Sequence, residues 1–189
     1  MTTTSPTSAL LLIDVQESFR HRPYWRAVGA EPFLSNTNKL IQACVNRGIP
    51  IVRVFHTDGE NVASNPFAQA SGHIKPLLGL VSFNEAIEIQ KQRHSALVGT
   101  GLSIWLHQNG IEKLLIAGIR TEQCCETTAR HASDEGWQVD YITEATLTFD
   151  MKTLNGETLS TAQIMERTEA VLKDRFAQIK TVDQVIREL

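Results

Sequence analysis

A chain of 189 residues with 42% hydrophobic content is long enough to bury one parallel sheet between two layers of helices. Its formal net charge of −3 provides no basic surface for a nucleic acid, and no apolar run approaches the ~20 residues of a membrane span. We therefore expect neither nucleic acid nor membrane as a partner. Three cysteines, an odd number, indicate free thiols in a reducing compartment, and hence a cytoplasmic protein.

The first eight residues are rich in threonine and serine. They lack the charged and apolar regions of a signal peptide. We expect a flexible tail over residues 1–8, followed by a single domain over residues 9–189.

From residue 9 onward, apolar runs alternate with amphipathic stretches, as a parallel sheet with right-handed crossovers requires. The pattern predicts an α/β fold, a doubly wound three-layer sandwich with a mostly parallel sheet of about six strands. The predicted strands are residues 9–14, 50–55, 86–90, 113–117, 138–143 and 177–180. The predicted helices are residues 31–47, 99–109, 122–136, 158–173 and 181–189, the last of them capped by Thr181. The longest irregular stretch, residues 56–84, has the length of a functional loop.

Two charged residues stand at predicted strand ends. Asp14 follows an apolar strand, where aspartate is not favoured by β-propensity, although it could equally cap a turn. Lys91 ends the alternating run Ile87 to Gln90, although a lone lysine at a strand end is usually only solvated. The carboxyl ends of parallel strands meet at one edge of a sheet, where open α/β folds bind their ligands. We therefore expect Asp14 and Lys91 to lie close together.

A cysteine follows a third strand end. Gly118 ends the predicted strand 113–117, Thr121 is a plausible N-cap, and Cys124 falls in the first turn of the next helix. There the unpaired N–H groups and the helix dipole favour a thiolate and can hold an oxyanion. Cysteine near an apolar strand is more often core filler, and Cys44 and Cys125 are interpreted in that way.

Three motifs carry a family resemblance. Residues 11–16 read Leu-Leu-Ile-Asp-Val-Gln, residues 91–97 read Lys-x-x-His-Ser-Ala-Leu, and residues 118–129 read Gly-Ile-x-Thr-x-x-Cys-x-x-x-Thr-Ala. In this order and spacing they closely resemble the isochorismatase-like cysteine hydrolases, a superfamily that includes nicotinamidases, N-carbamoylsarcosine amidohydrolases, ureidoacrylate and biuret hydrolases, and isochorismatases. The resemblance covers roughly residues 8 to 150.

The resemblance implies a catalytic triad of Asp14, Lys91 and Cys124. It also implies a cis peptide bond between Ile119 and Arg120, and an oxyanion hole formed by the backbone N–H groups of Arg120 and Cys124. For a superfamily of this kind it further suggests a homo-oligomer, a dimer or a tetramer.

The sequence departs from the family pattern near the substrate. His94 and Leu97 replace an aromatic residue and a phenylalanine, which changes the predicted pocket wall. The Asp-x-His pair that holds a metal ion in nicotinamidases is absent. His56, Asp58 and His73 are metal-ligand types, but their order is reversed and no second histidine cluster follows. We therefore predict no metal and no cofactor, and the pattern argues against nicotinamidase activity.

The predicted function is hydrolysis of a C–N bond in a small amide or carbamoyl compound, through a thioester on Cys124. The candidate substrate-binding residues are Phe19, Trp25, His56, His94 and Gln123, with the Arg120 side chain beside them. Phe19 and Trp25 are equally compatible with packing or subunit contacts. Two alternatives stay open: a vinyl ether hydrolase of the isochorismatase type that uses Asp14 without the cysteine, and a non-catalytic binding protein on the same fold.

Overall fold

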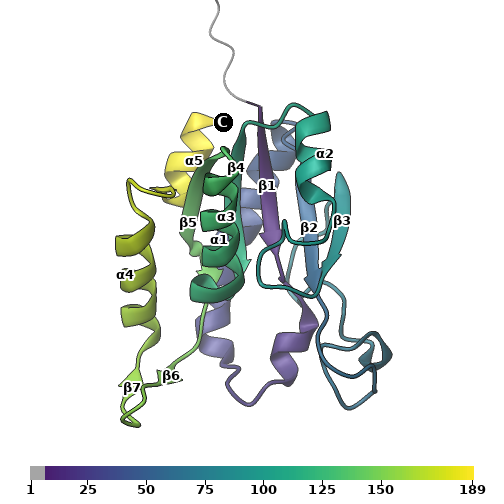
Figure 1. Ribbon diagram of the computed structural model, residues 1–189, viewed down its shortest axis with the longest axis vertical. Helices are drawn as coiled ribbons and strands as arrows, with labels where there is room; N and C mark the ends of the chain where they lie inside the picture. Colours follow the sequence, from purple (N-terminus) through teal and green to yellow (C-terminus); the bar gives the residue numbers. More distant parts are fainter. Residues whose placement is uncertain (1–6) are drawn as a thin grey trace, which may run out of the picture.

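The computed structural model describes residues 7–189, and its centre is a six-stranded sheet in the order β3-β2-β1-β4-β5-β8 (Figure 1). Every neighbouring pair in this sheet is parallel, which confirms the predicted α/β architecture. The strands are β1 (Ser8–Ile13), β2 (Ile51–His56), β3 (Ile87–Lys91), β4 (Lys113–Ile119), β5 (Gln138–Leu147) and β8 (Gln178–Ile179).

Helices cover both faces of the sheet. On one face lie α1 (Ala27–Asn46) and α5 (Val182–Glu188); on the other lie α2 (Leu102–Gln108), α3 (Glu126–Asp134) and α4 (Thr161–Leu172) (Figure 1). The connections contain the 3₁₀ helices η1 (Glu17–His21) and η2 (Gln69–Ser71), the π-helical turn η3 (Thr121–Cys125), and a small antiparallel hairpin of β6 (Met151–Lys152) and β7 (Thr158–Leu159). Within residues 7–189, no helix is both long and apolar enough to cross a membrane.

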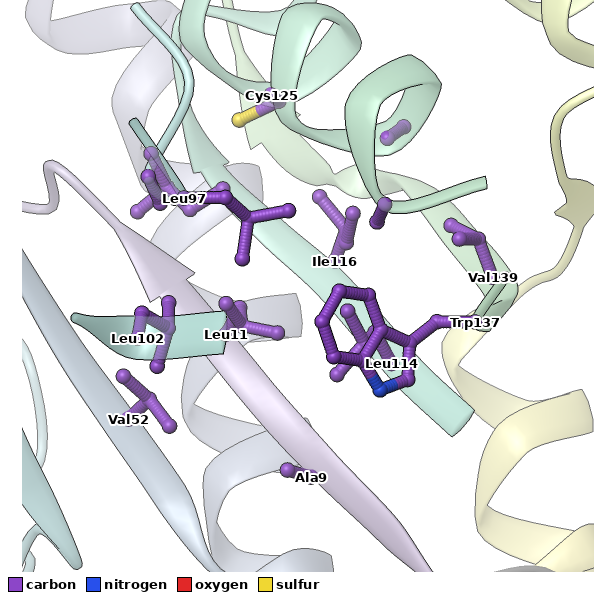
Figure 2. Close-up of a cluster of buried hydrophobic side chains, with 14 of the residues drawn as sticks. Ala9, Leu11, Val52, Leu97, Leu102, Leu114, Ile116, Cys125, Trp137 and Val139 are labelled. Carbon is purple, nitrogen blue, oxygen red and sulfur yellow. The ribbon is translucent and has the colours of Figure 1, made fainter. Parts of the chain in front are cut away.

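Strand β1 is buried on both faces, which explains why its sequence is continuously apolar. Leu10 and Leu12 pack in the cluster under α1, whereas Leu11 and Ile13 pack in the cluster under α2 and α3. A parallel strand buried on both faces needs apolar residues at every position, not at alternate ones. Figure 2 shows the cluster under α2 and α3, to which Cys125 belongs together with leucine, isoleucine and tryptophan side chains, and this confirms its interpretation as a packing residue.

Several predicted boundaries were wrong. Helix α1 begins at Ala27 instead of residue 31, because Ala30 is buried in the core and extends the helix ahead of Pro32. Residues 158–159 belong to β7, and α4 begins only at Thr161, after the Ser160 cap. Strand β5 continues to Leu147, where it pairs with the end of β4. The Thr181 cap of α5 is confirmed, with a reciprocal bond from Gln184.

Two further corrections concern the junction between β4 and the helical turn that follows it. Gly118 does not end β4 but lies within it, since the strand continues to Ile119. Thr121 is the first residue of η3, not its cap, and its hydroxyl bonds to Thr146. The predicted tail, residues 1–8, lies outside the described residues except for Thr7 and Ser8, and Ser8 already pairs in β1.

Candidate active site

The strand order reverses between β1 and β4. From β1 the chain proceeds outward to β2 and β3, and from β4 it proceeds to β5 and β8 on the other side. In open parallel sheets, ligands bind in the crevice at the carboxyl ends of the strands at such a reversal. Asp14 directly follows β1, Cys124 lies in the turn after β4, and Lys91 ends β3, so the topology brings all three to this edge.

The three side chains meet. Lys91 Nζ lies 2.8 Å from Asp14 Oδ2 and 3.3 Å from Cys124 Sγ. The side chains of Asp14 and Lys91 are both 0% exposed, and Cys124 is 6% exposed. A buried ion pair is costly unless each charge is well paired, and an ammonium between a carboxylate and a thiol meets that condition. The cluster combines a proton acceptor, a cation and a nucleophile within hydrogen-bonding distance.

Asp14 is held in a bend at the end of β1. Its φ of 53° is left-handed, a conformation that aspartate tolerates better than most residues. Its backbone N–H donates to the carbonyl of Val54, and its own carbonyl accepts from the N–H of Gln16. One carboxylate oxygen is bonded to Lys91, whereas Oδ1 is buried and has no partner among the described residues. Asp14 therefore keeps one oxygen available to accept a proton.

Cys124 is positioned by the π-helical turn η3. The carbonyl of Arg120 accepts from the N–H groups of Gln123 and Cys125, both at 3.2 Å, and Thr128 donates its hydroxyl to the carbonyl of Cys124 at 2.7 Å. The buried Tyr141 hydroxyl donates to the carbonyl of Thr121 at 2.7 Å. The peptide bond between Ile119 and Arg120 is cis, as the family resemblance implied.

The protonation state of Cys124 differs from the expectation. Burial, reinforced by the charge of Asp14, raises the pKa of the thiol to about 12, and Lys91 only partly opposes this. At neutral pH the raised pKa favours the thiol, in contrast to the thiolate expected at the helix terminus. Burial is the largest influence on this pKa and disfavours the charged form, whereas a helix dipole contributes only about 0.3–2 kcal/mol in the opposite direction. A reaction that used this sulfur as a nucleophile would need a base to take its proton.

This electrostatic arrangement makes a prediction for the Asp14→Asn variant. The substitution removes a negative charge that raises the Cys124 pKa and leaves Lys91, which lowers it. We expect iodoacetamide to alkylate Cys124 faster in the variant at mildly alkaline pH, because the thiolate fraction rises as the pKa falls. Turnover should nevertheless drop by roughly a hundredfold or more, since the base is lost. Mass spectrometry of the labelled peptide against pH measures the first effect.

Asp58→Asn is the matched control, because Asp58 lines the same pocket without bonding to Lys91. It should leave the labelling rate close to that of the wild type. Slower labelling of Cys124 in Asp14→Asn would contradict the assigned electrostatics.

Asp14 and Cys124 open onto a pocket of about 260 Å³. Of the predicted substrate-binding residues, Phe19, His56, His94 and Gln123 line it, together with Arg120. Trp25 does not; it packs on Phe149, with ring centroids 5.8 Å apart. Leu97 is buried in the core and likewise does not form the pocket wall. Asp58, considered above as a metal-ligand type, lines it too. The remaining lining residues, which sequence reasoning missed, are Arg22, Tyr24, Gly59, Asn65 and Phe67.

The missed residues come from two connections. Arg22 and Tyr24 follow η1, and the guanidinium groups of Arg22 and Arg120 lie over the Tyr24 ring at 5.7 and 5.3 Å from its centroid. Asn65 and Phe67 lie in the irregular stretch between β2 and β3, which was predicted to be functional but without naming residues. No spacing or motif distinguishes these positions along the chain.

The three candidate metal ligands, His56, Asp58 and His73, do not form one cluster. His73 stacks on His21, with ring centroids 3.6 Å apart, and does not line the pocket with His56 and Asp58. Across residues 7–189, no group of three or more histidine, cysteine or acidic side chains has a metal-binding arrangement.

A larger hollow of about 390 Å³ lies between α1, the end of β5 and α4, and shares Tyr24 with the first. Its walls include Phe33, Leu147 and Met165, and the described residues that line it contain no cysteine, lysine or histidine. It offers no nucleophile of these kinds.

The fold is a doubly wound parallel sheet, and an aspartate, a lysine and a cysteine meet at its switch point. The isochorismatase domain family matches residues 8–178, and the chain belongs to this family of hydrolases.

Among curated relatives, the uncharacterized isochorismatase family protein YrdC of Bacillus subtilis is 28% identical, with 95% of each chain covered. Nicotinamidase 3 of Arabidopsis thaliana is 29% identical, covering 98% of this chain and 90% of the relative. A crystal structure of a protein of the isochorismatase family from Chromobacterium violaceum superposes with a TM-score of 0.84 at 26% identity, covering 99% of this chain and 95% of the other.

Proposed function

We propose that this protein is a cysteine hydrolase that cleaves a C–N bond in a small amide or carbamoyl compound through a thioester on Cys124. The observation that carries the proposal is the position of Lys91 Nζ, 2.8 Å from the Asp14 carboxylate and 3.3 Å from the Cys124 sulfur, beside a pocket that both acid and thiol line. An aspartate, a lysine and a thiol in contact are sufficient for nucleophilic acyl transfer.

In the first half-reaction, Asp14 takes the thiol proton as the Cys124 sulfur forms a bond to the substrate carbonyl carbon. The carbonyl becomes an oxyanion, held by the backbone N–H groups of Arg120 and Cys124. When the carbonyl reforms, the C–N bond breaks, and the leaving nitrogen takes the proton from Asp14. In the second half-reaction, Asp14 accepts a proton from a water molecule while the water oxygen attacks the thioester carbon. Asp14 then returns that proton to the departing Cys124 sulfur.

Lys91 keeps Asp14 ionised and oriented through both half-reactions. Burial lowers the pKa of Lys91, but the charge of Asp14 and the hydrogen bonds to Asp14 and Cys124 more than offset this and raise it. The lysine therefore stays charged and does not act as the proton carrier. Removing it should lower turnover on the order of a hundredfold or more, as for other positioned acid–base groups.

The pocket sets the size and character of the substrate. A volume of about 260 Å³ admits a small molecule only. Phe19 in η1 offers an apolar side chain, and His94 after β3 and Gln123 in η3 offer polar groups. The relative named Nicotinamidase 3 supports an amide as the scissile group. The missing Asp-x-His pair argues for an amide other than nicotinamide.

The test is a turnover screen with a panel of small amides, ureido acids and isochorismate, combined with rapid acid quenching and mass spectrometry of the intact protein. We expect an amide or ureido acid to be hydrolysed and to leave an acyl group on Cys124 during turnover. Hydrolysis of isochorismate alone, with no covalent adduct, would replace the proposal with the vinyl ether reaction through Asp14. Absence of turnover for the whole panel, with unreactive Cys124, would favour a binding protein.

A further inference from the structure

We infer that His56 is a positioning residue for this cluster, a neutral imidazole that accepts the third proton of the Lys91 ammonium at Nδ1 and turns its Nε2–H toward the substrate. The inference rests on the proposed function and adds a fourth side chain to the proposed triad. Its basis is the contact between His56 Nδ1 and Lys91 Nζ, 3.1 Å apart.

Counting the protons of Lys91 gives the first argument. A lysine ammonium has three N–H donors and no acceptor. Its partners here are Asp14 Oδ2 at 2.8 Å, Cys124 Sγ at 3.3 Å and His56 Nδ1 at 3.1 Å. Each proton therefore has one acceptor. Without the imidazole, a fully buried ammonium would keep one N–H unpaired and could rotate away from the sulfur or the carboxylate.

The same contact determines the tautomer of His56. Because Lys91 is a donor only, Nδ1 must accept, and the proton of the neutral ring must be on Nε2. Nε2 has no hydrogen-bond partner among residues 7–189, although His56 lines the pocket. His56 therefore offers an N–H group to a substrate oxygen or nitrogen while its other side holds Lys91.

The backbone of His56 is held in place by strand pairing and by the side chain of Gln16. His56 and Lys91 are directly paired in the parallel register of β2 and β3. The buried Gln16 side chain bonds to both backbone groups of His56: its Oε1 accepts the His56 N–H at 2.7 Å, and its Nε2 donates to the His56 carbonyl at 2.9 Å. Gln16 also donates to Ser18 at 2.8 Å. Strand β1 thus positions both Asp14 and, through Gln16, the histidine.

The charges that face the imidazole favour its neutral form. Burial and the neighbouring Lys91 ammonium lower the pKa of His56, with His94 acting in the same direction, whereas Asp14 and Asp58 raise it and only partly compensate. In acid, a proton on Nδ1 would remove the acceptor of Lys91 and place two cations 3.1 Å apart. Because the pKa of His56 is lowered, the cluster should lose its geometry only at a pH below the ordinary pKa of histidine, about 6.5.

Two substitutions of His56 separate the effect of its hydrogen-bond acceptor from the effects of its charge and its size. In His56→Asn, the side-chain oxygen replaces Nδ1 as an acceptor but does not titrate; in His56→Leu, there is no acceptor. With a substrate identified from the panel, we expect His56→Leu to lower kcat by about tenfold to a hundredfold. His56→Asn should retain most of kcat near neutral pH, raise KM if Nε2–H binds substrate, and shift the acid limb of the kcat profile to lower pH. His73→Asn, outside the pocket, is the control and should leave the profile unchanged.

A second measurement does not depend on turnover, so it remains informative if the proposed function fails. Long-range ¹H–¹⁵N spectra report the tautomer of each histidine and its titration, and the His56 signal is assigned by its loss in His56→Asn. We expect Nδ1 of His56 to be unprotonated, and its pKa to rise in Lys91→Met, where the ammonium is replaced by an apolar chain. A protonated Nδ1 in the folded wild type, or equal kcat in the asparagine and leucine variants with an unshifted acid limb, would overturn the inference.

Discussion

Cys124→Ala should lower hydrolysis of an amide or ureido substrate by at least about 10⁴-fold, the scale on which other enzymes lose turnover when a member of a nucleophilic triad is removed. The variant keeps Asp14 and Lys91 in contact, at 2.8 Å, so the ion pair and the pocket should survive. What it loses is the atom that forms the covalent bond. Steady-state turnover and the mass of the quenched protein, which should carry no acyl group, measure the effect.

Cys125→Ala is the matched control for this experiment. Cys125 is the next residue, is fully buried, and lies in the core cluster shown in Figure 2. Its replacement should cost some stability but leave turnover and the acyl adduct in place. If Cys124→Ala hydrolysed amides at the wild-type rate, the sulfur would not be the nucleophile. If it retained isochorismate hydrolysis alone, Asp14 would act without the cysteine.

Gly118→Ala should destabilise the fold by more than about 4 kcal/mol, a large part of the roughly 5–15 kcal/mol that a domain of this kind possesses. A Cβ on Gly118 would lie 2.0 Å from the carbonyl oxygen of Ile13 and 2.7 Å from its carbonyl carbon, and φ at this position is +138°. Strands β1 and β4 would have to separate at the point where Asp14 and Cys124 leave the sheet. We therefore expect loss of activity even in molecules that fold. Urea denaturation followed by circular dichroism measures the stability.

Gly110→Ala is a control that separates the cost of a positive φ from the cost of the steric clash at Gly118. Gly110 also has a positive φ, +63°, but a Cβ at this position would have no atom of the described residues within 4 Å beyond its own chain neighbours. Its replacement should cost only about 1–2 kcal/mol, the ordinary penalty of a left-handed conformation for alanine. Equal losses for the two variants would show that the close approach of β1 and β4 is not what requires glycine at position 118.

The motif residues could be found along the chain for a geometric reason. Asp14, Lys91 and Cys124 each follow a strand in a predicted parallel array, and the carboxyl ends of such strands share an edge whatever the details of packing. The structure places the three side chains in contact there. Their chemical roles stay predictions, which the variants above test. The boundary errors, by contrast, arise where local preference competes with burial, as at Ala30 ahead of Pro32.

The sequence alone was enough to predict the layered parallel fold and the sheet edge at which its polar residues lie. The signals were the periodicity of apolar residues and the positions of glycines and helix caps, which depend only on neighbouring residues. Three features required the folded chain. The pocket walls at Tyr24 and Phe67 come from connections without a motif, the pKa of Cys124 follows from burial, and the contact of His56 with Lys91 joins two strands. Distance and desolvation between remote residues are set by packing, which no local pattern encodes.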